Sequence, residues 1–202
     1  MIETEMLATF SENLLSNDII AKPDDAREYL YSNNSYIPVS ALSPIIWLAG
    51  DHDLDEIPDI IDKGDRMVSE LIMKAIMSWD PYGIIFMPAA LKSEDKKYSN
   101  RYIMATNNII DVMNVDESHT YMEDNSDYGL PPELIVDELF ICENKYNLIP
   151  EHKKHIFRVK GSDDTIFFSA ELVNHVWDIA EKNGAIGLVQ EPFNFDEEAP
   201  VF

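Results

Sequence analysis

The chain has 202 residues, 46% of them hydrophobic and 26% charged, a composition typical of one folded domain with a packed core rather than of a disordered chain. Its 15 Lys and Arg residues against 38 Asp and Glu residues give a net charge of −23, which disfavours nucleic acid and anionic membranes as partners and suits a basic protein. The single cysteine, Cys142, excludes an intrachain disulfide. Because the acidic N-terminal segment MIETEMLATF does not resemble a signal peptide, we expect a cytoplasmic protein.

Residues 1–56 are expected to form a variable N-terminal portion of helices and irregular connections. Apolar residues between Ile2 and Leu15 recur near helical spacing and predict a first helix. The next segments predict, in chain order, a short helix at 26–31, an irregular connection at 32–44, a short strand at 45–50 and an exposed acidic loop at 51–62.

Two later segments, 66–88 and 165–192, predict the same strand-helix-strand order. In each segment a short apolar run ends at a serine, Ser69 or Ser169, whose hydroxyl is expected to cap the following helix. Further segments predict strands at 100–115, 134–142 and 155–159, and a hairpin-like turn at 160–164. The fold class predicted is a single α+β domain with a mostly antiparallel or mixed sheet, two similar strand-helix-strand units and a helical N-terminal portion.

No motif in the chain predicts a catalytic, cofactor or metal site. The sequence contains no GxSxG, GxxxxGK[ST], HExxH or GxGxxG pattern, and its seven glycines are too scattered to form a phosphate-binding loop. His152 and His155 are separated by two lysines, a pattern that favours a basic surface turn over a metal pair. Cys142 lies in an apolar segment and is expected to be a buried, inert thiol. We therefore expect no catalytic residue, no cofactor and no metal.

The strongest functional signal is an acidic window between Arg101 and Lys145, which contains no Lys or Arg. Its centre, SHTYMEDNSDYGLPPE at 118–133, interleaves aromatic residues with acids. Such a stretch is usually a solvated loop, and the functional interpretation is a docking surface on which carboxylates steer a basic partner and aromatic rings supply contact area. The candidate partner-binding residues are Asp116, Glu117, Tyr121, Glu123, Asp124, Asp127 and Tyr128.

Several stretches together resemble a known family. They are MVSELIMKAI and GIIFMPAAL, then RYIMATNNIIDVMNVDES, and above all HIFRVKGSDDTIFFSAELVNHVWDIAEKNGAIGLVQEP. The combination is similar to the small immunity proteins that accompany polymorphic toxins in bacteria, specifically the family numbered eleven. The resemblance covers an α+β domain at 57–192 and leaves an acidic C-terminal tail at 193–202.

The resemblance implies a protein that binds a cognate toxin domain and blocks it, with no turnover of its own. The leading hypothesis is therefore stoichiometric neutralisation of a toxin, expected to be basic, without nucleic-acid or membrane binding. Two alternatives remain: an enzyme that reverses the toxin's modification, which would need convergent carboxylates or a metal in a pocket, and an acidic adaptor or nucleic-acid mimic, which would bind many basic proteins with little selectivity.

Overall fold

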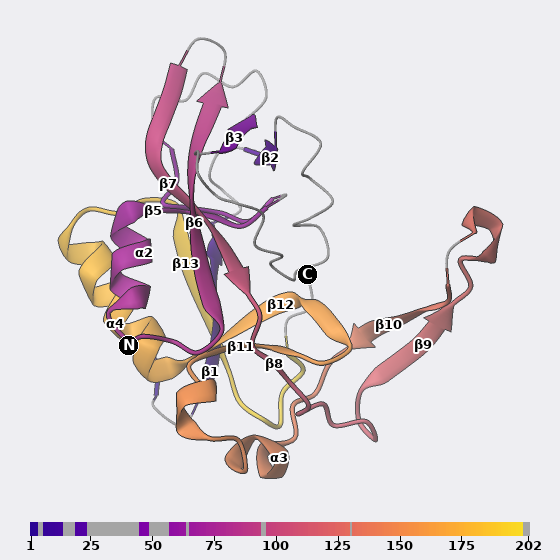
Figure 1. Cartoon of the computed structure of the whole chain (residues 1–202). Coiled ribbons are helices and arrows are strands. Elements are labelled where there is room, and N and C mark those ends of the chain that lie inside the picture. The colour runs from indigo at the N-terminus through magenta and orange to yellow at the C-terminus, as the bar shows by residue number, and fades with distance from the viewer. Residues whose placement is uncertain are drawn as a thin grey trace.

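A computed structural model describes residues 1–3, 6–13, 19–23, 45–48, 57–63, 65–93, 96–129 and 131–199 (Figure 1). The described strands form two mixed sheets and one separate two-stranded hairpin. The predicted helix at 26–31 and the predicted connection at 32–44 lie outside the described residues. None of the helices in the described part of the chain is long and apolar enough to span a membrane.

The first sheet has six strands, with β7 pairing to both β6 and β5 in antiparallel fashion. In sheet order the strands are β2 (Lys22–Pro23), β3 (Ile45–Leu48), β6 (Ile84–Ser93), β7 (Lys96–Thr106), β5 (Met67–Ser69) and β4 (Ile60–Ile61). Because both neighbours run opposite to β7, β5 and β6 run parallel to each other, and helix α2 (Glu70–Met77) connects them.

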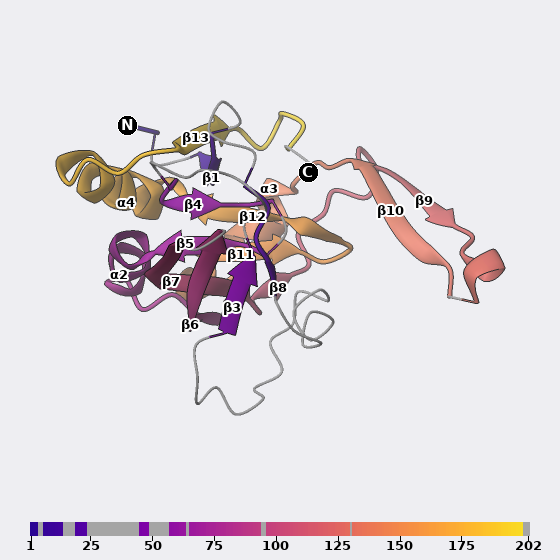
Figure 2. The same cartoon turned by 90° about the horizontal axis from the view of Figure 1, so that it is seen from above.

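The second sheet has five strands and repeats that arrangement. In sheet order they are β13 (Leu188–Phe193), β1 (Leu7–Glu12), β12 (Ser162–Ser169), β11 (Ile156–Val159) and β8 (Ile109–Ile110). Strands β12 and β13 are each antiparallel to β1, so they run parallel to each other, and helix α4 (Ala170–Lys182) connects them. Both predicted segments thus form a strand-helix-strand unit with an antiparallel strand between its two strands. Helices α2 and α4 lie side by side (Figures 1 and 2).

The two helices begin differently. The Ser69 hydroxyl accepts a hydrogen bond from the Ile72 N–H at 3.4 Å, which confirms the predicted cap of α2. The prediction for α4 was wrong, because the Ser169 side chain makes no capping hydrogen bond and its Oγ lies 3.4 Å from Nδ1 of His155 instead. The Ser169 hydroxyl therefore contacts His155, the residue immediately before β11, instead of an N–H of the helix.

The helical N-terminal portion predicted from the sequence was also wrong, because residues 7–12 form strand β1. This strand lies between β12 and β13, and five of its six residues are buried. A short apolar run that is buried on both faces has no period that separates strand from helix. The predicted acidic loop at 51–62 was wrong in part for the same reason, since Ile60 and Ile61 form β4 and are fully buried.

The core has three clusters. The largest fills the space between the two helices and the sheets, where Phe10 meets the rings of Phe168 and Trp177 edge to face at centroid distances of 6.2 and 6.4 Å. A second cluster surrounds Phe157 and Phe167, whose rings stack at 5.5 Å. The third lies under the six-stranded sheet.

The described part of the predicted acidic tail is packed against the second cluster, with the Ala199 N–H donating to the Leu139 carbonyl at 2.7 Å.

Three short helical elements lie in the connections between strands. Helix α3 (Glu143–Asn147) and two turns of 3₁₀ helix, η1 (Ser126–Tyr128) and η2 (Glu151–Lys153), are the remaining helical elements described. The two sheets meet where the Asp59 N–H donates to the Ile186 carbonyl and the Ile186 N–H donates to Oδ2 of Asp59, both at 2.9 Å. Gly187, which follows, lies against Pro58. This junction fixes the two strand-helix-strand units to each other.

Candidate functional site

A two-stranded hairpin projects from the body of the molecule on the side opposite to α2 and α4 (Figures 1 and 2). It is formed by β9 (His119–Glu123) and β10 (Glu133–Glu138), which pair with each other and with no other strand of the described chain. Between them the chain passes through η1 and ends that turn at Gly129, in the left-handed conformation with φ of 70°. The hairpin therefore projects without a flanking strand of the described chain on either edge.

The base of the hairpin is fixed to the body by paired hydrogen bonds. The Ser118 hydroxyl accepts from the Phe140 N–H at 2.9 Å, and the Asn114 N–H donates to the Phe140 carbonyl at 2.8 Å. Val136 and Leu139, at the end of β10, are buried in the second core cluster. These contacts connect the two ends of the hairpin to each other and to the core of the molecule.

The two faces of the hairpin differ in character. Cross-strand partners share a face, and successive residues alternate between faces. We call the set Thr120, Met122, Leu134 and Val136 the body face, and the set Tyr121, Glu123, Glu133 and Ile135 the solvent face. On the body face Val136 is buried, and a Cβ atom added to Gly161, in the turn between β11 and β12, would lie 3.2 Å from Cδ2 of Leu134. The solvent face is thereby directed away from that turn.

The solvent face combines an exposed aromatic ring with a pair of carboxylates. Tyr121 is 45% exposed and stands opposite Ile135 in the register. Glu123 stands opposite Glu133, both are exposed, and neither has an ion-pair partner among the described residues. Nearer the base, Nδ1 of His119 lies 3.2 Å from Oδ2 of Asp137. The distal half of this face thus carries like charges without a cation.

The acidic tip has a defined local structure. Oδ1 of Asp124 accepts a hydrogen bond from the Ser126 N–H at 2.9 Å, and hydrogen bonds from Ser126 lower the pKa of the Asp124 carboxyl below its ordinary value. Asp127 lies in the first turn of η1. Both carboxylates are exposed, so this turn adds negative charge at the far end of the hairpin.

The structure brings some, but not all, of the predicted partner-binding residues together. Tyr121 and Glu123 share the solvent face, Asp124 and Asp127 lie at the tip, Asp116 and Glu117 lie in an exposed turn before the base, and the Tyr128 side chain lies outside the described residues. The loop predicted around them was wrong in part, since 119–123 is a strand. Sequence reasoning also left out Glu133 and Ile135. The sequence signal for these two residues is the alternation of side chains between two faces in the segments before and after Gly129. That alternation shows which residues share a face only when the pairing of the two strands is known.

The serine and histidine side chains near α2 and α4 do not form a nucleophile and base. Oγ of Ser78 donates to the Ala75 carbonyl at 2.7 Å and lies 3.0 Å from Nε2 of His175. Because a hydroxyl has one proton, the imidazole nitrogen donates to Ser78 in this arrangement and does not accept from it. Within the described ranges, no group of three His, Cys, Asp or Glu side chains is placed to hold a metal ion.

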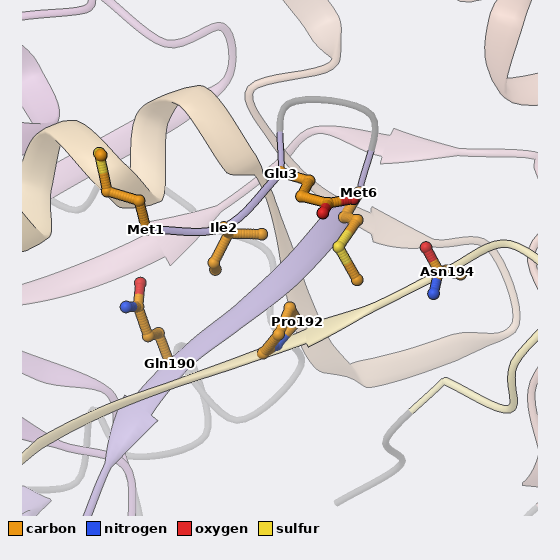
Figure 3. A pocket seen from close by; sticks show the side chains of 7 residues that line it. All are labelled: Met1, Ile2, Glu3, Met6, Gln190, Pro192 and Asn194. Atoms are coloured by element: carbon orange, nitrogen blue, oxygen red, sulfur yellow. The ribbon is translucent and has the colours of Figure 1, made fainter.

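An open cavity of about 360 Å³ lies at the N-terminal segment (Figure 3), and no described residue of the hairpin lines it. It is lined by Met1, Ile2, Glu3, Met6, Gln190, Pro192 and Asn194. Asn174 on α4 holds this segment in place, since its side chain both accepts from the Ile2 N–H and donates to the Ile2 carbonyl at 2.7 Å. Glu3 is the one ionisable side chain of this lining.

The comparisons with known proteins agree with the resemblance seen in the sequence. A family model described as an immunity protein family (Imm11) matches residues 52–190, which is more than half of the chain. No curated protein matches the chain. The matched range contains both strand-helix-strand connections and the whole hairpin.

Proposed function

Since the chain belongs to the immunity protein family Imm11, we propose that it protects its cell by binding a cognate toxin domain stoichiometrically, with the hairpin β9–β10 as the docking element. The observation that carries the proposal is the projecting hairpin, whose exposed residues include several acids and Tyr121 beside the apolar Met122 and Leu134. A two-stranded hairpin gains little stability from its own contacts in water. A protein that holds such an element away from its body has a surface available for a partner.

The charge of the hairpin supports a basic toxin as the partner. The whole window from 102 to 144 contains acids but no Lys or Arg, so the negative field of the hairpin is not cancelled locally. Exposed carboxylates of this kind raise association rates with a basic surface more than they add affinity. Immunity proteins are generally not enzymes, and the Ser78–His175 contact is not arranged for nucleophilic attack.

Complex formation is tested with a shortened hairpin. Thr120 and Val136 are cross-strand partners, so residues 121–135 can be replaced by Asn-Gly, a dipeptide that closes a two-residue hairpin turn. We expect the wild-type protein to rescue growth and co-purify when it is co-expressed with the toxin domain encoded beside it, and the shortened variant to do neither. Its melting curve must match that of the wild type. Rescue by substoichiometric wild-type protein without a stable complex would favour the enzymatic alternative.

The steering role of the carboxylates is tested by kinetics. The triple variant Glu123→Gln, Asp124→Asn and Asp127→Asn should associate more slowly than the wild type and lose salt dependence between about 0.01 and 0.15 M, where the screening length falls from roughly 30 to 8 Å. A charge-matched control changes three exposed acids outside the hairpin: Asp178→Asn, Glu181→Gln and Glu191→Gln. Equal association rates for the triple variant and this control would assign the acidic window to solubility.

A further inference from the structure

We infer that the solvent face of the hairpin is the recognition face, and that the Glu123–Glu133 pair together with Tyr121 receives an arginine side chain of the partner. This inference rests on the proposed function and names the chemistry of the contact. It concerns one face of the hairpin and one kind of side chain, which the family match does not specify.

The first argument is the unpaired carboxylates. Side chains directly opposite each other in an antiparallel pair have Cβ atoms about 4.5–5.5 Å apart, and like charges there destabilise the pair. Glu123 and Glu133 occupy such positions. Since the neighbouring window contains no Lys or Arg, the chain does not supply the cation from nearby in sequence. A guanidinium group from outside would convert this repulsion into two charge-assisted hydrogen bonds.

The second argument decides between the two faces. On the body face Val136 is buried and Leu134 lies next to the turn at Gly161, so the half of this face nearest the base is occupied by the protein itself. Its far end is the exposed but uncharged Met122, which offers no carboxylate to a basic side chain. The solvent face carries the pair Glu123 and Glu133, both of which are exposed. It also places Tyr121 one pair of residues before the carboxylates, on the same side. A partner that approaches the hairpin from solvent therefore meets the ring and both carboxylates together.

The third argument favours arginine over lysine. A guanidinium group is planar, donates through several N–H groups in a fixed fork, and stacks on aromatic rings. Two carboxylates beside an exposed ring match both properties, because the fork can bridge Glu123 and Glu133 while the plane or the stem covers Tyr121. Ile135, opposite Tyr121, adds apolar surface for the stem.

The experiment measures the dissociation constant of the toxin domain encoded beside this protein for single variants of the hairpin. We expect Glu123→Gln and Glu133→Gln each to weaken binding by roughly 10- to 100-fold, and the double variant to weaken it by little more than either one, because both groups hold one cation. Tyr121→Ala should weaken binding by a similar factor. Met122→Ala is the matched control, since Met122 is 60% exposed but lies on the body face. It and Asp178→Asn, at an exposed acid outside the hairpin, should change binding less than about 3-fold.

A second measurement uses the free protein. Because Glu123→Gln removes a repulsion, amide hydrogen exchange in β9 and β10 should be unchanged or slower in this variant, so that the hairpin keeps its stability while the complex loses affinity. Faster exchange would mean that the glutamates stabilise the free hairpin, and would overturn the inference. The inference would also be overturned if both glutamine variants bound the toxin domain like the wild type, or if Met122→Ala weakened binding more than Tyr121→Ala. In each of these cases the proposed function would stand. Failure of the wild type to form any complex would instead refute the proposed function.

Discussion

Gly187 is the position where the structure predicts the clearest effect of a single methyl group. The residue precedes β13, has φ of 70°, and lies so close to Pro58 that an added Cβ would be 2.4 Å from the proline Cβ and 3.1 Å from its Cα. Gly184, at the end of α4, has nearly the same φ of 69° but no atom within 4 Å of an added Cβ. The two glycines therefore separate the cost of the backbone conformation from the cost of the contact.

The magnitudes follow from these two terms. A left-handed conformation costs an alanine about 1–2 kcal/mol, and the reduced freedom of the unfolded chain returns about 0.4–1 kcal/mol. We therefore expect Gly184→Ala to destabilise the protein by about 1 kcal/mol. At Gly187 the overlap with a rigid ring adds about 1–3 kcal/mol, the usual cost of overpacking, because neither the ring nor the backbone can rotate away.

The assay compares the two alanine variants by thermal and urea unfolding. An extra 1–3 kcal/mol should lower the melting temperature of Gly187→Ala by roughly 2–12 °C relative to Gly184→Ala in a chain of this size. Adding Pro58→Gly should recover part of the loss, and the coupling between the two substitutions measures the contact. Equal stabilities of the two alanine variants, or no coupling with Pro58→Gly, would refute the packing proposed at this junction.

Two further predictions concern stability. Ser69→Ala should destabilise the protein by about 0.5–2 kcal/mol and Ser169→Ala by less, because only Ser69 caps its helix; urea unfolding decides, and the reverse order would contradict the capping assignment. Burial raises the pKa of the Tyr146 hydroxyl above its ordinary value, with smaller contributions from Glu151 and Glu171. The folded state therefore keeps this group neutral, and its contribution to stability is lost as the pH rises above about 10, where the unfolded chain ionises. Tyr146→Phe should flatten the loss of stability above pH 10 in urea titrations, whereas Tyr82→Phe, at an exposed tyrosine, should leave the profile unchanged; parallel profiles for both variants would contradict the assignment.

The parts of the fold that were predicted correctly depend on local sequence. Helices α2 and α4 each place an apolar stripe on one face and begin next to a serine, and both features lie within a few residues of each other in the chain. Strand β1 depends on its partners instead. Its residues are buried because β12 and β13 flank them, and the run LATFSE alone does not contain that information.

The residues of the candidate site also differ in whether local sequence or contacts between segments identify them. Acidity and aromatic residues drew attention to Tyr121 and Glu123 because both signals are present in the sequence itself. That Glu133 belongs to the same face as Glu123 follows from the register of β9 and β10, which is a contact between segments. Strand β9 was missed because its residues are exposed or half-buried, so it lacks the buried face that makes strands recognisable.

The central place of β1 has a consequence for how the protein is made. Leu7 pairs with Ser169 on one side and with Phe193 on the other, so both edges of this strand stay open until nearly the whole chain has been synthesised. Contacts this distant in sequence form slowly, and an unpaired apolar strand is prone to pair with other chains in the meantime. On a translating ribosome the five-stranded sheet therefore closes as one of the last events. A chain that stops before β13 leaves an edge of β1 uncovered.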